Sequence, residues 1–193
     1  MNNFELIKPL LKFETDDDFY HLQILKRKKE NPELGSNSYV VKTYYISSVE
    51  YLESKMNEII ALCDLHKARA YINLNCRSFE AMAFHTLKKI TDQILNKDYK
   101  SVRKAYESMC GAITNPKKQK IWVIDLDNLT EVPETMINFI NGLDPIGDKI
   151  VGVIPTKNGL HLLSTPFNRK MFSQQTEYQN IDIQTNNPTI LYF

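Results

Sequence analysis

The sequence predicts an α+β protein with an N-terminal α/β unit and a C-terminal unit built mainly on a sheet. In the first 115 residues, β-branched and aromatic runs alternate with segments whose apolar residues recur at helical spacing. In residues 116–193, short strand-like runs separated by turn residues dominate. Hydrophobic residues make up 42% of the 193 residues, which suffices for one core. We therefore expect a single domain, residues 1–193, with subunits of about 1–115 and 116–193.

The first subunit is expected to alternate strands with helices. Apolar stripes at helical spacing define its helices, and serines precede two of them as candidate caps. Turn-forming residues predict a loop between its first two strands. The expected elements are a short helix within 1–18, strands at 19–29 and 39–47 around the loop 30–38, a helix over 49–66 capped by Ser47 or Ser48, a strand at 68–75, a helix over 78–95 capped by Ser78, and a helix over 99–112.

The second subunit is expected to contain short strands and two helices. Two of its strands are joined by the turn "KNG", which predicts a β-hairpin. The basic segment 115–120 marks the boundary with the first subunit. The expected elements are strands at 120–127, 148–156 and 160–165, helices over 131–143 and near 168–175, and final strands at 180–184 and 189–193.

Charge and cysteine content narrow the functional classes. The formal net charge is +1, so nucleic-acid contacts would depend on local basic patches rather than on a global field. Cys63, Cys76 and Cys110 form no CxxC pair, which argues against a thiolate zinc site and fits a reducing compartment. The N-terminal segment carries early acidic residues, and no stretch has the length of a membrane span. We expect a cytoplasmic protein without membrane association.

Two carboxylates stand at the end of an apolar run. Asp125 and Asp127 follow the sequence "IWVI", and residues two apart in a strand share a face, about 7 Å from one another. Two ionised carboxylates at that separation repel each other unless a cation or water screens them. Mg²⁺ and Mn²⁺ prefer carboxylate oxygens, so the pair is a candidate metal site. Alternatively, "DLDN" forms a turn and caps the helix that follows.

Polar residues recur on the next strands. Thr156, Lys157 and Asn158 form a turn whose hydroxyl, ammonium and backbone N–H groups suit phosphate oxygens, and His161 follows in an apolar strand. A histidine among leucines is often simply packed in a core. Asp182 lies between two isoleucines, so its side chain faces either solvent or a site.

These stretches together resemble the archaeo-eukaryotic primase superfamily, in particular its primase-polymerase domains. The matching features are "WVIDLD", "PTKNGLHLL" and "NIDIQ", in this order, within residues 120–193. The resemblance implies that the C-terminal unit is an RRM-like mixed sheet carrying the active-site acids, with the N-terminal α/β unit packed on it.

The resemblance also implies an activity, nucleotidyl transfer to a nucleic-acid strand with two Mg²⁺ or Mn²⁺ ions. It implies that Asp125, Asp127 and Asp182 are catalytic and hold the metals, and that His161 contacts the triphosphate of the incoming nucleotide. Thr156, Lys157, Asn158 and Arg77 are further candidate nucleotide-binding residues. The partners would be template, primer, nucleoside triphosphate and a helicase or other replication protein, in a bacterial, viral, phage or mobile-element setting.

Basic residues are candidates for phosphate contacts with template and primer. Each also has the simpler interpretation of a solvated surface residue. Arg69 flanks the strand 68–75 and either reaches a ligand or pairs with a nearby acid. The remaining candidates lie in two runs: Lys26, Arg27, Lys28 and Lys29, and Lys117, Lys118 and Lys120.

Two other functions remain open. In the first, the chain is a primase-type domain with an incomplete site, which would act as a nucleic-acid-binding or replication-accessory module. "VIDLDN" also resembles the first motif of haloacid dehalogenase-type phosphatases, which implies that Asp125 is a nucleophile. In that alternative, "VGVIPT", Lys170 and Asp182 would supply the later motifs.

Overall fold

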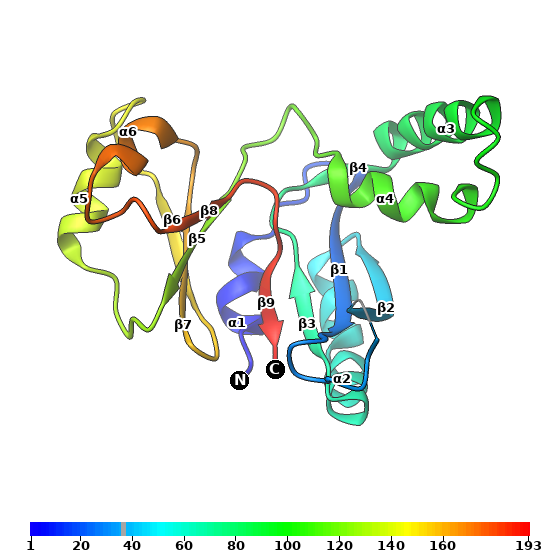
Figure 1. The fold of residues 1–193 in the computed structure, drawn as a ribbon, viewed down its shortest axis with the longest axis horizontal. Helices are drawn as coiled ribbons and strands as arrows, with labels where there is room; N and C mark the ends of the chain where they lie inside the picture. The colour runs from blue at the N-terminus through cyan, green and yellow to red at the C-terminus, as the bar shows by residue number, and fades with distance from the viewer. Residues whose placement is uncertain (36–37) are drawn as a thin grey trace.

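The computed structural model describes residues 1–35 and 38–193, so Ser36 and Asn37 of the predicted loop 30–38 lie outside the described residues. The described residues form two units side by side, each built on its own antiparallel sheet (Figure 1). Together the two sheets and six α-helices confirm the α+β prediction. In this part of the chain, no helix combines the length and apolar character needed to cross a membrane.

The first unit contains a sheet with strand order β2-β1-β3-β9, and the short strand β4 pairs with the start of β1. Every neighbouring pair is antiparallel. Two α-helices and a short 3₁₀ helix accompany this sheet. Their bounds are α1 Phe4–Ile7, the 3₁₀ helix Lys8–Leu10, β1 Asp18–Lys26, β2 Tyr39–Ile46, α2 Val49–His66, β3 Arg69–Ile72, β4 Arg77–Ser78 and β9 Thr189–Tyr192.

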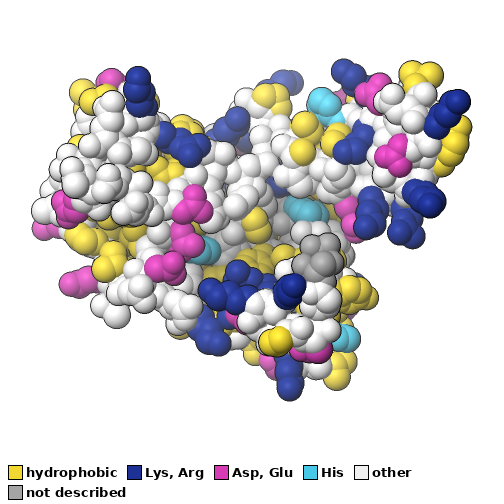
Figure 2. Space-filling view, viewed as in Figure 1, with side chains coloured by type: hydrophobic (Ala, Val, Ile, Leu, Met, Phe, Trp, Pro, Cys, Tyr) yellow, Lys and Arg dark blue, Asp and Glu magenta, His cyan; other side chains and the backbone are white. Residues whose placement is uncertain are grey.

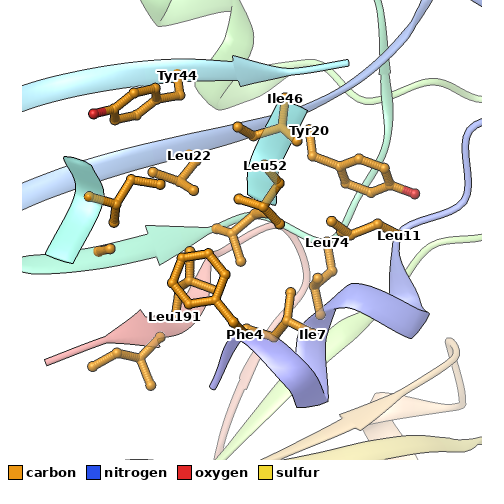
Figure 3. Close-up of a cluster of buried hydrophobic side chains, with 14 of the residues drawn as sticks. Phe4, Ile7, Leu11, Tyr20, Leu22, Tyr44, Ile46, Leu52, Leu74 and Leu191 are labelled. Carbon is orange, nitrogen blue, oxygen red and sulfur yellow. The ribbon is translucent and has the colours of Figure 1, made fainter. Parts of the chain in front are cut away.

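A hydrophobic core holds α1 and α2 against one face of this sheet. Alternate residues of β1 point into it, as the two-residue period of a strand requires. Figure 3 shows Phe4 and Ile7 of α1 near Leu52 of α2, with Leu22 and Leu191 from two strands of the sheet. On the opposite face, Phe19 of β1 packs in a small separate hydrophobic cluster with Met82 and Cys110, and polar side chains such as His21 and Gln23 lie further along the strand.

Serine caps fix the starts of the two long helices. The Ser48 hydroxyl accepts a hydrogen bond from the Tyr51 amide at 3.0 Å, so Ser48 rather than Ser47 caps α2. Ser78 likewise caps α3, Phe79–Leu95, by accepting from the Ala81 amide at 3.0 Å. The helix predicted over 99–112 is shorter than expected: a 3₁₀ turn, Val102–Lys104, precedes α4, Ala105–Ala112.

The second unit follows the order strand, helix, strand, strand, helix, strand. Its sheet has the strand order β6-β7-β5-β8, and each neighbouring pair is antiparallel, so the sheet is not mixed as expected. This is the β-α-β-β-α-β ferredoxin-like arrangement. The predicted hairpin is β6 with β7. The bounds are β5 Trp122–Asp127, α5 Glu134–Gly142, β6 Ile150–Pro155, β7 Gly159–Ser164, α6 Arg169–Gln174 and β8 Asp182–Gln184.

The two faces of this second sheet have different partners. Ile124 and Leu126 point toward α5 and α6 and form a core with residues such as Phe172. Trp122 packs there too, with its ring 5.4 Å from that of Phe167, which supports the expectation that it is a core residue. On the other face, the valine, isoleucine and leucine side chains join the core of the first unit: Val123, Ile154 and Leu163.

The last strand departs from the predicted subunit boundary. The chain leaves β8 and returns to the first unit, where β9 pairs with β3 and buries Ile190 and Leu191. The second unit therefore ends before residue 189, and the two termini lie side by side through a bridge between Asn2 and Tyr192 (Figure 1). Pairing with the free edge of β3 and burial of Ile190 and Leu191 account for this placement.

Candidate functional site

Strand register places the predicted site residues in one row across the second sheet. Asp125 on the central strand β5 is directly opposite His161 on β7 and opposite Asp182 on β8. Paired residues of an antiparallel ladder project from the same face, so these three side chains are neighbours. Asp127 lies two residues further along β5, opposite Gly159. The row lies on the sheet face that α5 and α6 leave uncovered.

The His161 ring is held between a carboxylate and a hydroxyl. Its Nε2 atom lies 3.7 Å from Asp125 Oδ1, and its Nδ1 atom lies 2.8 Å from Thr189 Oγ1. A threonine hydroxyl both donates and accepts, so it can serve either neutral tautomer of the ring. Because Thr189 belongs to β9, the first unit orients a side chain of the second unit.

Burial changes the protonation of this pair. The His161 side chain is 13% exposed, and burial lowers its pKa although Asp125 and Asp127 favour the charged ring. Burial likewise raises the pKa of the Asp125 carboxyl; His161 opposes this rise, whereas Asp127 and Asp182 add to it. Burial thus disfavours the charged form of both groups, and a cation bound beside Asp125 would favour the ionised carboxylate.

Gly159, two residues before His161, lies where β7 approaches β5 closely. A Cβ atom built there would lie 2.1 Å from the Leu126 carbonyl oxygen and 3.0 Å from the Asp127 Cα atom. A side chain would therefore force β7 away from the end of β5. The glycine allows the two strands to approach where both acids and His161 project.

Basic side chains of the first unit face the acids across a cleft of about 160 Å³. Figure 2 shows acidic side chains gathered beside a histidine, with Lys and Arg side chains next to them around a hollow. The turn before β7 forms one wall of the cleft. The lining side chains are Asp125, Asp127, Thr156, Lys157, Asn158 and His161 from the second unit, and Arg27, Lys29, Arg69, Tyr71 and Ile190 from the first.

Two of these basic residues are held by polar partners. Arg27 Nη1 donates to the Tyr71 hydroxyl at 3.2 Å, which places the guanidinium at the cleft wall. Arg69 forms an ion pair with Glu30, as one of the two predicted alternatives stated, and it also lines the cleft. Lys29 is exposed at the cleft and adds a third positive charge.

Other candidate residues lie outside the cleft. Arg77 is fully buried and donates to the backbone carbonyls of Asn75 and Cys110, so it cannot contact a nucleotide bound between the acids and Lys157. Lys26 pairs with Glu33 at 2.9 Å.

The second basic run and the third acid also depart from the expected arrangement. Lys118 is 2.8 Å from carboxylate oxygens of Glu14 and Asp18, where it compensates the buried Asp18 rather than facing the site. Asp182 is in the row of acids but exposed, and its Oδ2 atom accepts a hydrogen bond from Gln184 Nε2 at 2.7 Å. It is thus beside the cleft rather than part of its lining.

The alternative prediction that "DLDN" caps the following helix is wrong. Helix α5 begins at Glu134 with Pro133 at its N-cap, and no side chain caps it. Asp125 and Asp127 are therefore not required by the helix that follows them. Residues 1–35 and 38–193 contain no ready-made group of three His, Cys, Asp or Glu side chains that could hold a metal ion. A cation would be held first by these two carboxylates.

Two residues of the site carry no signal in the sequence. Thr189 and Tyr71 lie in ordinary apolar strands, and only the pairing of β3 with β9 and the packing of the two units bring them to His161 and Arg27. No protein-family model matches the chain, and comparisons with curated proteins and with solved structures found no match either.

Proposed function

We propose that this chain is a primase-polymerase-like nucleotidyltransferase that adds nucleotides to a nucleic-acid strand. One observation carries the proposal: the strand register aligns Asp125 with His161 and Asp182 on the sheet face turned toward the first unit, opposite Arg27, Lys29 and Arg69 of that unit. The β-α-β-β-α-β order agrees with the RRM-like sheet that the sequence resemblance implies.

The acidic half of the cleft fits divalent cations. Asp125 and Asp127 offer carboxylate oxygens, the ligands that Mg²⁺ and Mn²⁺ prefer, and Asp182 lies beside them. The raised pKa of Asp125 reflects burial together with two neighbouring negative charges, a situation that a bound cation relieves. Such ions supply a lowered pKa for an attacking 3′-hydroxyl and stabilise charge on the transferred phosphoryl group.

The basic half of the cleft fits a triphosphate. Lys157, Thr156 and Asn158 lie in the turn before β7, and Arg27 and Arg69 face them. Their ammonium, hydroxyl and guanidinium groups bind phosphate oxygens by charge-assisted hydrogen bonds. A neutral His161 whose Nδ1 is bonded to Thr189 directs Nε2 into the same space, where it can donate to a phosphate oxygen. The acidic side chains would thus hold the metal ions, and the basic and polar side chains on the other side of the cleft would hold the nucleotide.

Asp127→Asn tests the proposal with the fold intact, because Asp127 is exposed at the end of its strand. Wild-type protein should bind Mn²⁺ in a titration and extend a primed template in the presence of Mg²⁺ or Mn²⁺. The variant should lose at least a hundredfold of the extension rate and bind Mn²⁺ more weakly, with an unchanged circular dichroism spectrum. Asp148→Asn removes an exposed carboxylate elsewhere and is the matched control.

The results would contradict the proposal in two ways. Wild-type protein that neither binds Mn²⁺ nor extends a primer would exclude this activity. An Asp127→Asn variant that unfolds would show instead that the acid is structural.

An accessory nucleic-acid-binding domain is the second candidate. The exposure of Asp182, its bond to Gln184 and its position outside the cleft favour an incomplete metal site. Such a domain would bind a primed template without extending it. Nothing comparable favours the phosphatase alternative, because Lys170 lies in α6, on the opposite side of the sheet from Asp125.

A further inference from the structure

A second polar cavity adjoins the acidic cleft on the first unit. Its volume is about 130 Å³, and Tyr71 lines both spaces. His21 and Arg77 lie in its wall, together with the amide side chains of Gln23 and Asn73. Among the described residues that line it, none is an aspartate or glutamate. The cavity thus presents hydrogen-bond donors and a positive charge but no carboxylate.

Arg77 is a buried cation without a carboxylate partner. Its side chain is 0% exposed, Nε and Nη1 donate to the carbonyls of Cys110 and Asn75, and Nη2 has no hydrogen-bond partner. Within residues 1–35 and 38–193, no acidic side chain forms an ion pair with it. Burial lowers its pKa to about 10, so it stays protonated at pH 7. A buried charge is costly unless an anion compensates it.

His21 adds a second donor beside this cation. It is 6% exposed, and its Nε2 atom is buried without a hydrogen-bond partner. Burial, and then the charge of Arg77, lower its pKa to about 4, so the ring is neutral at pH 7. The tautomer protonated at Nε2 can donate to an anion without adding a second buried charge. Both residues line the cavity, and two buried nitrogen atoms without hydrogen-bond partners on neighbouring side chains are unusual in a native fold.

We propose that this cavity binds a phosphate of the backbone of a nucleic-acid strand whose end lies in the acidic cleft. The inference rests on the proposed function for the identity of the strand. A cavity of 130 Å³ is smaller than the roughly 300 Å³ typical of pockets that enclose a whole ligand, which suits a single phosphate group. Since Tyr71 joins the two spaces, a strand could pass from one to the other. Arg77, excluded from the nucleotide cleft, would then position the strand.

Histidine NMR tests the cavity in the unmodified protein. In protein labelled with ¹⁵N-histidine and free of divalent metal, inorganic phosphate should shift the His21 ring signals in a saturable way. His66 and His85 should not respond, and sodium chloride at equal ionic strength should not reproduce the shift. An unchanged His21 signal, or equal shifts at all histidines, would overturn the proposal.

Three further ligands distinguish the source of the phosphate. A short oligothymidylate without terminal phosphates should shift His21, whereas thymidine, which has no phosphate, should not. A nucleoside triphosphate alone should shift the ring signals of His161 instead. A triphosphate that shifts His21 while the oligonucleotide does not would overturn the assignment to a strand.

Variants connect the signal to Arg77. Arg77→Gln should abolish the response of His21 to phosphate, Arg77→Lys should retain part of it, and Arg103→Gln, which removes an exposed arginine, should leave it unchanged. Should Arg77→Gln fail to fold, His21→Gln should bind the oligonucleotide roughly tenfold more weakly. Unchanged binding by that variant would contradict the proposal. These measurements need neither metal nor catalysis. If the protein extends a primer but His21 does not respond to phosphate, the phosphate-binding role of the cavity is refuted while the proposed function stands.

Discussion

Two strand histidines, His21 and His161, illustrate how neighbours set the chemistry of a residue. His161 lies beside carboxylates and a hydroxyl, whereas His21 lies beside the guanidinium of Arg77. Burial lowers the pKa of both rings, but the carboxylates oppose this at His161 and the guanidinium adds to it at His21. The sequence around each histidine is an apolar strand, so this difference has no local signal.

The low pKa of His21 predicts a loss of stability in mild acid. The folded ring titrates at about 4, whereas an unfolded histidine titrates at about 6.5, so below pH 6.5 the unfolded chain binds a proton that the folded one excludes. The stabilisation is complete above about pH 6.5 and is lost as the pH falls toward 4. Between pH 7 and pH 5 the loss from His21 should be about 2 kcal/mol. His21→Gln should remove this part of the pH dependence, measured by urea unfolding in phosphate-free buffer.

The matched control for this prediction is His85→Gln, which removes an exposed histidine of α3. It should unfold with the same pH dependence as the wild type. Equal pH dependence in His21→Gln and the wild type would show that His21 does not exclude the proton.

At the scale of elements, local patterns predict the helices and the hairpin well. Helix α2 has the predicted bounds, Ser48 and Ser78 cap their helices, and β6 pairs with β7 across the "KNG" turn. Asp125 and Asp127 share a strand face, because a strand alternates its side chains strictly. Local patterns fail at α4, where the expected helix begins with a 3₁₀ turn. The mixed sheet that the resemblance implied for the second unit is wrong, because every strand pair there is antiparallel.

The contact between β5 and β7 predicts a specific effect of Gly159→Ala. The new methyl group would meet the Leu126 carbonyl, so β7 must move at the position that carries His161. We expect a loss of about 1–3 kcal/mol in the free energy of unfolding, together with weaker Mn²⁺ and nucleotide binding. Gly152→Ala in β6 is the matched control, because a Cβ there has no heavy atom within 4 Å. Similar stability of the two variants would contradict the close approach.

At the scale of the whole molecule, the two units share a core and exchange polar contacts. Val123 and Leu163 of the second sheet belong to the hydrophobic cluster of the first unit. The Asn75 side chain donates to the Ile121 carbonyl at 3.1 Å and accepts from its amide at 2.7 Å, so it continues the backbone hydrogen bonding from one unit to the next. Asn3 donates to the carbonyls of Pro155 and of Ile190 in β9.

This shared core predicts a single cooperative unfolding transition. The only tryptophan, Trp122, reports on the second unit, whereas most of the helical signal comes from α2 and α3 of the first. Fluorescence and far-ultraviolet circular dichroism should therefore give coincident urea transitions.

A variant on the helix-covered face of the second sheet tests the same coupling. Leu162→Ala should shift the fluorescence and circular dichroism transitions together, with a loss of about 2–5 kcal/mol. Two separate transitions, or a shift confined to fluorescence, would show that the units unfold independently.

The sequence by itself determined the secondary structure and the residues that share a strand face, because helical and strand periods are local properties. It also placed Asp125, Asp127 and His161 as candidates for one site. The tertiary structure decided that β9 returns to the first sheet and that Thr189 orients His161. It also decided that Arg27 and Arg69 face the acids, and that Arg77 is buried and lines the second cavity instead. These outcomes depend on pairing and packing between segments far apart in the chain, which no local pattern encodes.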